Sequence, residues 1–284
     1  MKILKDTRCI IGEGPIWNQK EKCLYFTNGG GGNAICIYDP KTENVQVRSL
    51  PFGVAAFAFN KENRLLVSHA GGVHILGEDN ELIEVYDSSK YEIRFANDMK
   101  VGPNGAIYVG TQSEKRKGIS DRIDGKLYRI SPSGEVKLLL DGLRLSNGME
   151  WSLDEKRFYH TDSDTRLIKE YDFDQCTGDI AFTGRQIEVR GVDGFTIGSD
   201  GCLYVGCWGQ GHIAVVDTKD MKLVRTIKMP AQIPASCGFF GENMNRLAIT
   251  TASMGADLSE DPNAGFLVVE ETDVCGRAPY VFGG

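Results

Sequence analysis

The sequence of 284 residues contains no apolar run long enough for a membrane-spanning helix. Charged residues interrupt its first ten positions, so they do not form the apolar stretch of a signal peptide. Basic residues are also scarce, because 32 Lys and Arg stand against 39 Asp and Glu and give a formal net charge of -7. We therefore expect neither a membrane nor a nucleic acid as a partner, since both attract proteins with a basic surface.

The eight cysteines include no C-x-x-C pair. Chains that depend on disulfides are usually short and secreted, and this chain is neither short nor visibly secreted. Cys202 and Cys207 are five residues apart, which predicts opposite faces of one strand. We expect free, mostly buried thiols in a cytoplasmic protein.

Helical periodicity is also missing, because apolar residues recur almost everywhere with a period of two. Glycine is abundant instead: 34 of 284 residues is about 12%, against roughly 7% in an average protein. A hydrophobic share of 41% argues against a disordered chain. Together these features predict many short strands joined by tight turns.

Six segments repeat one pattern of an apolar strand, a polar turn and a second apolar strand. The second strands are expected to start at Leu24, Leu65, Ile107, Phe158, Leu203 and Leu247. These starts are 41, 42, 51, 45 and 44 residues apart. A third apolar strand is expected at 34–39, 125–131, 167–174, 212–218 and 265–271.

This spacing is typical of propeller blades. We predict an all-β, six-bladed β-propeller with four-stranded antiparallel blades and a metal site in the central channel. The whole chain, 1–284, is expected to form a single domain. Residues 2–8 are expected to pair with the last blade and close the ring.

Each repeat has a large apolar residue in its first strand, and the residue four positions earlier carries an amide or a carboxylate in four repeats and is small in the other two. These earlier residues are Glu13, Ala55, Asn97, Asn147, Asp193 and Ser236. The first strand of a propeller blade lines the channel, so equivalent positions should converge there. Two carboxylates and two amides without a basic residue would form a cage of oxygen atoms, which suits a divalent cation such as Ca²⁺.

A purely structural role is the alternative for these residues. Glycine follows Glu13, Asn147 and Asp193, and Asx residues beside glycine often bond to local backbone in turns. Turn chemistry gives no reason for carboxylates and amides to recur at one repeat position. The shared position therefore favours the metal site.

Nucleophilic catalysis has little support. The sequence has no G-x-S-x-G motif, and His69, His74, His160 and His212 have no serine or cysteine partner at a recognisable spacing. His160 and His212 are expected to be structural. The segment 112–125 accounts for the longest repeat interval, and it is either a lid that supplies Glu114 or Lys115 to a substrate or a solvated hairpin.

Several motifs resemble those of the regucalcin (senescence marker protein), gluconolactonase and luciferin-regenerating-enzyme-like family. They read GEGPIW, NDMKVGPNGAIYVGT, LSNGMEWSLDEKRFYHTDS, VDGFTIGSDGCLYVGCWGQGHI and PASCGFF, in the order of the family. The resemblance implies a six-bladed propeller that hydrolyses sugar lactones with one divalent metal. It implies that Glu13, Asn147 and Asp193 are metal ligands and that Asn97 reaches substrate or a water on the metal.

One departure concerns substrate binding. The family often has arginine two residues before the second asparagine, in R-x-N-D, whereas here Arg94 stands three residues before Asn97. We expect Arg94, Asn97 and Glu114 to contact the lactone and Asp193 or Glu13 to act as general base. Ca²⁺ is the favoured ion, with Zn²⁺, Mn²⁺ and Mg²⁺ as alternatives.

Other functions remain open from the residues alone. A metal and a water would also suit other esters or phosphotriesters. A non-catalytic propeller that binds calcium or a protein is a different class of function. We expect a monomer or a weak oligomer.

Overall fold

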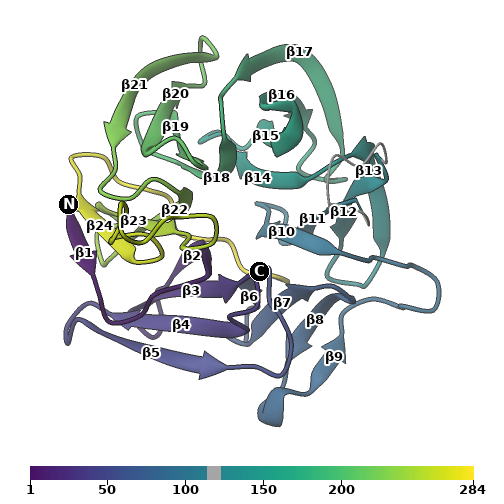
Figure 1. The fold of residues 1–284 in the computed structure, drawn as a ribbon. Helices are drawn as coiled ribbons and strands as arrows, with labels where there is room; N and C mark the ends of the chain where they lie inside the picture. The colour runs from purple at the N-terminus through teal and green to yellow at the C-terminus, as the bar shows by residue number, and fades with distance from the viewer. Residues whose placement is uncertain (114–122) are drawn as a thin grey trace. The chain divides into compact units, whose positions relative to one another are not determined.

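The computed structural model of the chain describes residues 1–113 and 123–284. Within these residues the regular structure consists of 24 strands and two 3-10 turns, Glu78–Asn80 and Ser163–Thr165. The strands form six four-stranded sheets (Figure 1), so the predicted all-β, six-bladed β-propeller with antiparallel blades is confirmed. No helix of the described residues is long and apolar enough to cross a membrane.

The chain divides into two compact units, and the first, residues 1–53 and 187–279, contains three of the sheets. One sheet consists of β2 (Ile11–Asn18), β3 (Cys23–Gly29), β4 (Ala34–Asp39) and β5 (Asn44–Ser49). Another consists of β18 (Val192–Ile197), β19 (Cys202–Cys207), β20 (His212–Asp217) and β21 (Lys222–Lys228). The third consists of β22 (Pro234–Phe240), β23 (Arg246–Thr251), β24 (Leu267–Glu271) and β1 (Lys2–Leu4).

The second unit, residues 54–186 and 280–284, accounts for the other three sheets. One consists of β6 (Ala56–Phe59), β7 (Leu65–His69), β8 (Gly72–Leu76) and β9 (Leu82–Glu84). The next consists of β10 (Ala96–Val101), β11 (Ile107–Thr111), β12 (Gly125–Ile130) and β13 (Val136–Leu143). The last consists of β14 (Ser146–Trp151), β15 (Arg157–Asp162), β16 (Leu167–Phe173) and β17 (Ile180–Glu188).

The strand positions agree closely with the repeat pattern. Each predicted start of a second strand lies within one residue of the observed start of β3, β7, β11, β15, β19 or β23. Gly105 and Gly201 end the predicted polar turns with positive φ angles of 70° and 75°, a conformation that other residues adopt only with strain. The N-terminal strand β1 pairs with β24, with Lys2 opposite Val269, which confirms the expected pairing with the last blade.

Burial differs sharply between the first and last strands of a sheet. Every residue of β14 and of β22 is buried, whereas β5 and β21 are mostly exposed. An edge strand needs polar side chains to stay soluble, whereas a strand that is covered on both faces holds a polar side chain only where that side chain has hydrogen-bond partners. The fully buried strands are therefore the ones that can fix a functional side chain most rigidly.

The cysteines are all free thiols. Four are buried, Cys9, Cys36, Cys207 and Cys237, while Cys176 and Cys275 are exposed. Free thiols were predicted, but the expected burial holds for only half of them. Cys202 and Cys207 begin and end strand β19, as their spacing predicts.

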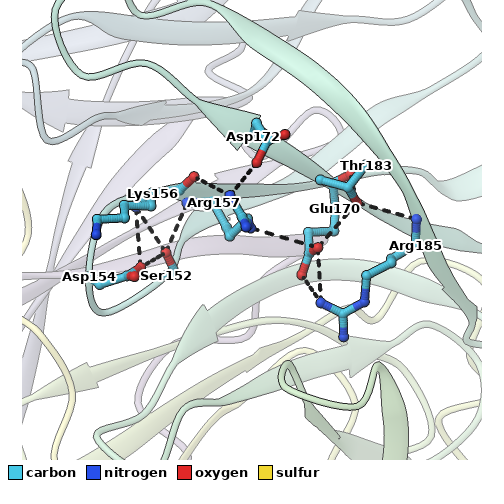
Figure 2. Close-up of polar contacts among 8 residues, drawn as sticks. All are labelled: Ser152, Asp154, Lys156, Arg157, Glu170, Asp172, Thr183 and Arg185. Carbon is cyan, nitrogen blue, oxygen red and sulfur yellow. Dashed lines mark hydrogen bonds and ion pairs between the residues drawn. The ribbon is translucent and has the colours of Figure 1, made fainter.

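A buried carboxylate joins the two outer strands of the sheet that begins with β14 (Figure 2). Glu170 on β16 is only 2% exposed, and both of its oxygens lie within 3.0 Å of Arg185 Nη1 on β17. Thr183 Oγ1 donates to Glu170 Oε1 at 3.1 Å, and Arg157 Nε lies 3.9 Å from the same oxygen. The charge of Glu170 is therefore compensated by two arginines and a hydroxyl group.

Candidate functional site

The residues predicted to surround the metal occupy the first strand of their sheets. Glu13 lies on β2, Asn97 on β10, Asn147 on β14 and Asp193 on β18. Ser236 lies on β22, and Ala55 directly precedes β6. The repeat position inferred from the sequence therefore lies on the first strand of five sheets and directly before the first strand of the sixth.

This position coincides with an irregularity of the strand. Register shifts of the β-bulge type occur between Glu13 and Ile16, Ala96 and Met99, Asn147 and Met149, Val192 and Phe195, and Pro234 and Ser236. A bulge adds a residue to one strand and turns its side chain away from the regular alternation, and bulges are frequent beside active sites. The polar residues are therefore placed where the backbone can aim them individually.

In the first unit, β22 contacts both β2 and β18. The approach is close, because a Cβ atom on Gly194 would lie 2.2 Å from Ser236 Oγ, and one on Gly238 would lie 2.2 Å from the Pro15 carbonyl oxygen. Asp193, next to Gly194, is only 6% exposed. Glycine at these two places thus allows the strands that carry Glu13 and Asp193 to pack against β22.

In the second unit, Asn97 and Asn147 are held through their amide nitrogens. Asn97 Nδ2 donates to the Ser146 carbonyl at 3.1 Å, and Asn147 Nδ2 donates to Ser163 Oγ at 3.2 Å. Ser68 Oγ also donates to the Asn97 backbone carbonyl at 2.9 Å. The amide group has its hydrogen-bond donor at Nδ2 and its acceptor at Oδ1. Because Nδ2 is already bonded, Oδ1 is the atom that can coordinate a cation or accept a hydrogen bond from a substrate.

A buried serine and histidine support Asn97. Ser146 Oγ lies 2.7 Å from His160 Nε2, and both residues are almost fully buried. Burial, together with the nearby Lys169 ammonium, lowers the pKa of His160 to about 3. The histidine is therefore neutral at physiological pH and holds Ser146, whose carbonyl accepts from Asn97.

His160 has a serine partner that no recognisable sequence spacing indicates. Ser146 and His160 are 14 residues apart, on the two strands of the β14–β15 hairpin. No short motif signals such a pair, because its contact depends on the bulge in β14. The structural role expected for His160 agrees with its burial.

Arg94 lies in a polar cavity next to the start of β10. Its guanidinium Nη2 is 2.5 Å from Glu92 Oε1. The cavity has a volume of about 190 Å³ and is lined by Glu92, Arg94, Phe95, Thr111, Gln112, Asp124, Lys126 and Tyr128. It presents both hydrogen-bond donors and acceptors, which suits a ligand with several hydroxyl groups.

The additional residue between Arg94 and Asn97 is accommodated by a turn. Phe95 has a φ of 54°, in the left-handed region, and its carbonyl accepts from the Gln112 N–H at 3.0 Å. Asn97 does not line the cavity that contains Arg94. Glu114 and Lys115, the predicted lid residues, lie outside the described residues.

The carboxylates, histidines and cysteines of the described residues include no group of three or more that could hold a metal ion. The predicted ligand set has a different composition, since Asn147 contributes an amide and only Glu13 and Asp193 are carboxylates. Carboxylate and amide oxygens are the donors that hard cations such as Ca²⁺ prefer. The residue types therefore fit a divalent cation with oxygen ligands.

The comparisons with known proteins identify the family of the chain. Residues 11–253 match the model of the family described as SMP-30/Gluconolactonase/LRE-like region. The chain therefore belongs to this family. Regucalcin of Oryctolagus cuniculus is 32% identical over 289 residues, covering 97% of this chain and 96% of the relative.

Solved structures show the same relationship. A luciferin-regenerating enzyme superposes with a TM-score of 0.85 at 25% identity, covering 96% of this chain and 95% of the other. A calcium-binding protein, regucalcin from Agrobacterium tumefaciens, superposes with a TM-score of 0.87 at 21% identity, covering 99% and 96%. The second likeness bears on the fold alone.

Proposed function

We propose that this protein hydrolyses a sugar lactone with the help of one divalent cation. The observation that carries the proposal is that four oxygen-bearing side chains, Glu13, Asn97, Asn147 and Asp193, share one strand position next to a bulge. Membership of a family whose description includes gluconolactonase supports the same reaction.

Glu13, Asn147 and Asp193 are the proposed ligands of the cation. Their oxygen donors favour Ca²⁺, although Zn²⁺, Mn²⁺ or Mg²⁺ could occupy the same set according to supply. When bound, such a cation polarises the lactone carbonyl and lowers the pKa of water.

Asp193 is the proposed general base, because it is a nearly buried carboxylate at the shared strand position. In the first step a water oxygen bonds to the lactone carbonyl carbon, and Asp193 takes the proton of that water. The bond between this carbon and the ring oxygen then breaks, and Asp193 returns the proton to the leaving alkoxide. The product is an open-chain hydroxy acid, and Asp193 ends in its starting state. Glu13 is the alternative base.

Asn97 is proposed to orient the substrate or the attacking water. Its amide nitrogen is fixed by Ser146, so its Oδ1 atom can accept a hydrogen bond from a hydroxyl group or a water. Arg94 is proposed to bind the sugar hydroxyls from its own cavity, with Lys126 and Gln112 as further donors. Glu114 is kept as a proposed substrate contact on the basis of the sequence alone.

The decisive experiment follows proton release from a panel of aldonolactones by the purified protein. The protein is first treated with a chelator, and Ca²⁺, Mn²⁺, Zn²⁺ and Mg²⁺ are then added back singly. Hydrolysis that stops on chelation and returns with one ion would establish the reaction and identify the metal. The same panel ranks the lactones.

A calcium-binding protein without lactonase activity is the second candidate, because the same carboxylate and amide oxygens could hold Ca²⁺ without opening a lactone. Cation binding without hydrolysis of any lactone would favour it and contradict the lactonase proposal. Carboxylic esters and phosphotriesters would then be assayed under the same ions, since an activated water can attack these bonds too.

The cellular location and the oligomeric state are also proposals. The eight free thiols support a reducing compartment, for which we propose the cytoplasm. We propose a monomer or a weak oligomer in solution, which sedimentation at several protein concentrations would test.

A further inference from the structure

Two side-chain contacts connect the first strands β10 and β14, which belong to different sheets. Asn97 Nδ2 donates to the carbonyl oxygen of Ser146 at 3.1 Å. Further along the same strands, Lys100 Nζ lies 2.8 Å from Glu150 Oε2. The second contact is an ion pair and has no place in the reaction proposed above.

The ion pair is placed symmetrically with respect to the two asparagines. Lys100 follows Asn97 by three residues on β10, and Glu150 follows Asn147 by three residues on β14. Each interval contains the register shift of its strand. The ion pair therefore joins the two strands directly beyond their bulges.

A bulge interrupts the backbone ladder that would otherwise fix a residue's position. Asn97 and Asn147 both lie at such an interruption, so their own sheets hold them less firmly than a regular strand would. The separation between the two amides then depends on contacts that run from β10 to β14. Lys100 and Glu150 provide a charged contact of this kind.

The burial of the pair argues against a role in stability alone. The side chain of Glu150 is 7% exposed and that of Lys100 is 30% exposed. Glu150 Oε1 also accepts the Trp151 N–H at 2.9 Å, so both carboxylate oxygens are engaged. A buried ion pair gives little net stability, because the desolvation of the charges offsets their attraction, whereas it can specify one arrangement of the chain.

We infer that Lys100 and Glu150 are positioning residues, whose ion pair fixes the separation of the Asn97 and Asn147 amides. The inference rests on the proposed function, in which Asn147 binds the cation and Asn97 contacts the substrate or water. Lys100 and Glu150 act through these asparagines. An apolar contact at this place would add a little stability, but it would not fix the separation of the two oxygen donors as the ion pair does.

The test compares variants that break the pair with a matched control. Lys100→Met and Glu150→Gln each remove one charge of the pair, and Lys100→Arg keeps it. Lys100 also interacts electrostatically with Asp98. Lys100→Met removes this second interaction and Glu150→Gln keeps it, so agreement between the two variants assigns the effect to the Lys100–Glu150 pair. Arg185→Met is the control, because it breaks the ion pair with buried Glu170 in the sheet that also contains Glu150 (Figure 2).

Three quantities are measured for each full-length variant. Thermal unfolding reports stability, calorimetric titration with Ca²⁺ or Mn²⁺ alone reports cation affinity, and lactone hydrolysis reports kcat and KM. Loss of a residue that orients a metal ligand typically lowers metal affinity or activity by roughly 10 to 100-fold. We expect a loss of cation affinity or kcat of this size in Lys100→Met and Glu150→Gln. Lys100→Arg keeps the charge and should have values close to the wild type, and Arg185→Met should have wild-type affinity and kcat.

The inference fails if Lys100→Met and Arg185→Met lose the same thermal stability and both retain wild-type cation affinity and kcat. A failure of the proposed function gives a different result. If the wild type binds the cation but opens no lactone, the lactonase proposal falls and the cation affinities of the variants still decide the role of the pair. A wild type that binds no divalent cation overturns both.

Discussion

His69 Nε2 lies 2.9 Å from His74 Nδ1, across the turn that joins β7 to β8. The backbone N–H of Gly71 donates to His69 Nδ1 at 3.1 Å, so the neutral His69 ring must have its proton on Nε2. That proton is donated to His74 Nδ1. Protonation of either ring at its accepting nitrogen would place two donors against each other and break this chain of hydrogen bonds.

The histidine pair predicts how stability depends on pH. Burial lowers the pKa of both rings below the ordinary value of 6.5; the nearby His74 adds to the effect at His69, while Glu84 opposes it at His74. As the pH falls, the two histidines therefore bind protons at a higher pH in the unfolded chain than in the folded chain. The stabilisation that is present above pH 6.5 is lost as the pH falls toward the lowered pKa values of the folded state.

Urea unfolding of the wild type and of His69→Gln/His74→Gln at several pH values from about 8 to about 5 measures this effect. We expect the free energy of unfolding to fall less steeply below pH 6.5 in the double variant. His160 has a lowered pKa in both proteins, so its contribution cancels in the comparison. Equal slopes would mean that the pair is not the source of the pH dependence.

Asp193 is expected to be essential for turnover. General acid–base catalysis contributes about 100 to 10,000-fold, so Asp193→Asn and Asp193→Ala should both lose activity by orders of magnitude while the far-ultraviolet circular dichroism spectrum is retained. Glu13→Gln provides the comparison, since a larger loss of kcat at Asp193 identifies the base. Activity above about a tenth of the wild type in Asp193→Ala would contradict the assignment.

The cavity around Arg94 is expected to affect substrate binding more than chemistry. Arg94→Met and Lys126→Met each remove hydrogen-bond donors from its lining, so KM for a sugar lactone should rise several-fold while kcat changes little. Leu138→Ala on the exposed face of β13 is a control that should change neither constant. An unchanged KM in both cavity variants would show that the sugar binds elsewhere.

Glu170 is expected to contribute to stability without affecting the reaction. Hydrogen bonds to a charged group typically contribute roughly 1.5 to 3 kcal/mol, so Glu170→Ala should lower the free energy of unfolding by about this amount. Both arginines beside it are more than 40% exposed, so water can solvate them and the lower end of the range is expected. Urea denaturation measures the loss, and a value near zero would show that the network is not stabilising.

The sheets could be predicted from the sequence because each depends on local chemistry. Alternating apolar residues and turns such as Pro103-Asn104-Gly105 mark a strand pair without reference to the rest of the chain. The third strand of the second sheet, β8, was expected but received no bounds, because it follows β7 after only Ala70 and Gly71, a connection without a longer polar turn. The periodicity of the two strands therefore merges in the sequence.

The strand position of the candidate site was also predictable, because a repeat places equivalent residues at equivalent points of each blade. The contacts that support the site were not. The pairs Ser146–His160, His69–His74 and Lys100–Glu150 depend on bulges, tight turns or the approach of strands from different sheets. None of these distances follows from residue spacing alone.

The pairing of β1 with β24 has a consequence for the synthesis of the chain. Lys2 leaves the ribosome more than 260 residues before its partner Val269. At about 5 to 20 residues per second, the first strand waits on the order of 10 to 50 seconds for the strand beside which it belongs. Its sheet is thus the last to be completed, and a nascent chain that stops before residue 267 leaves this strand without its template.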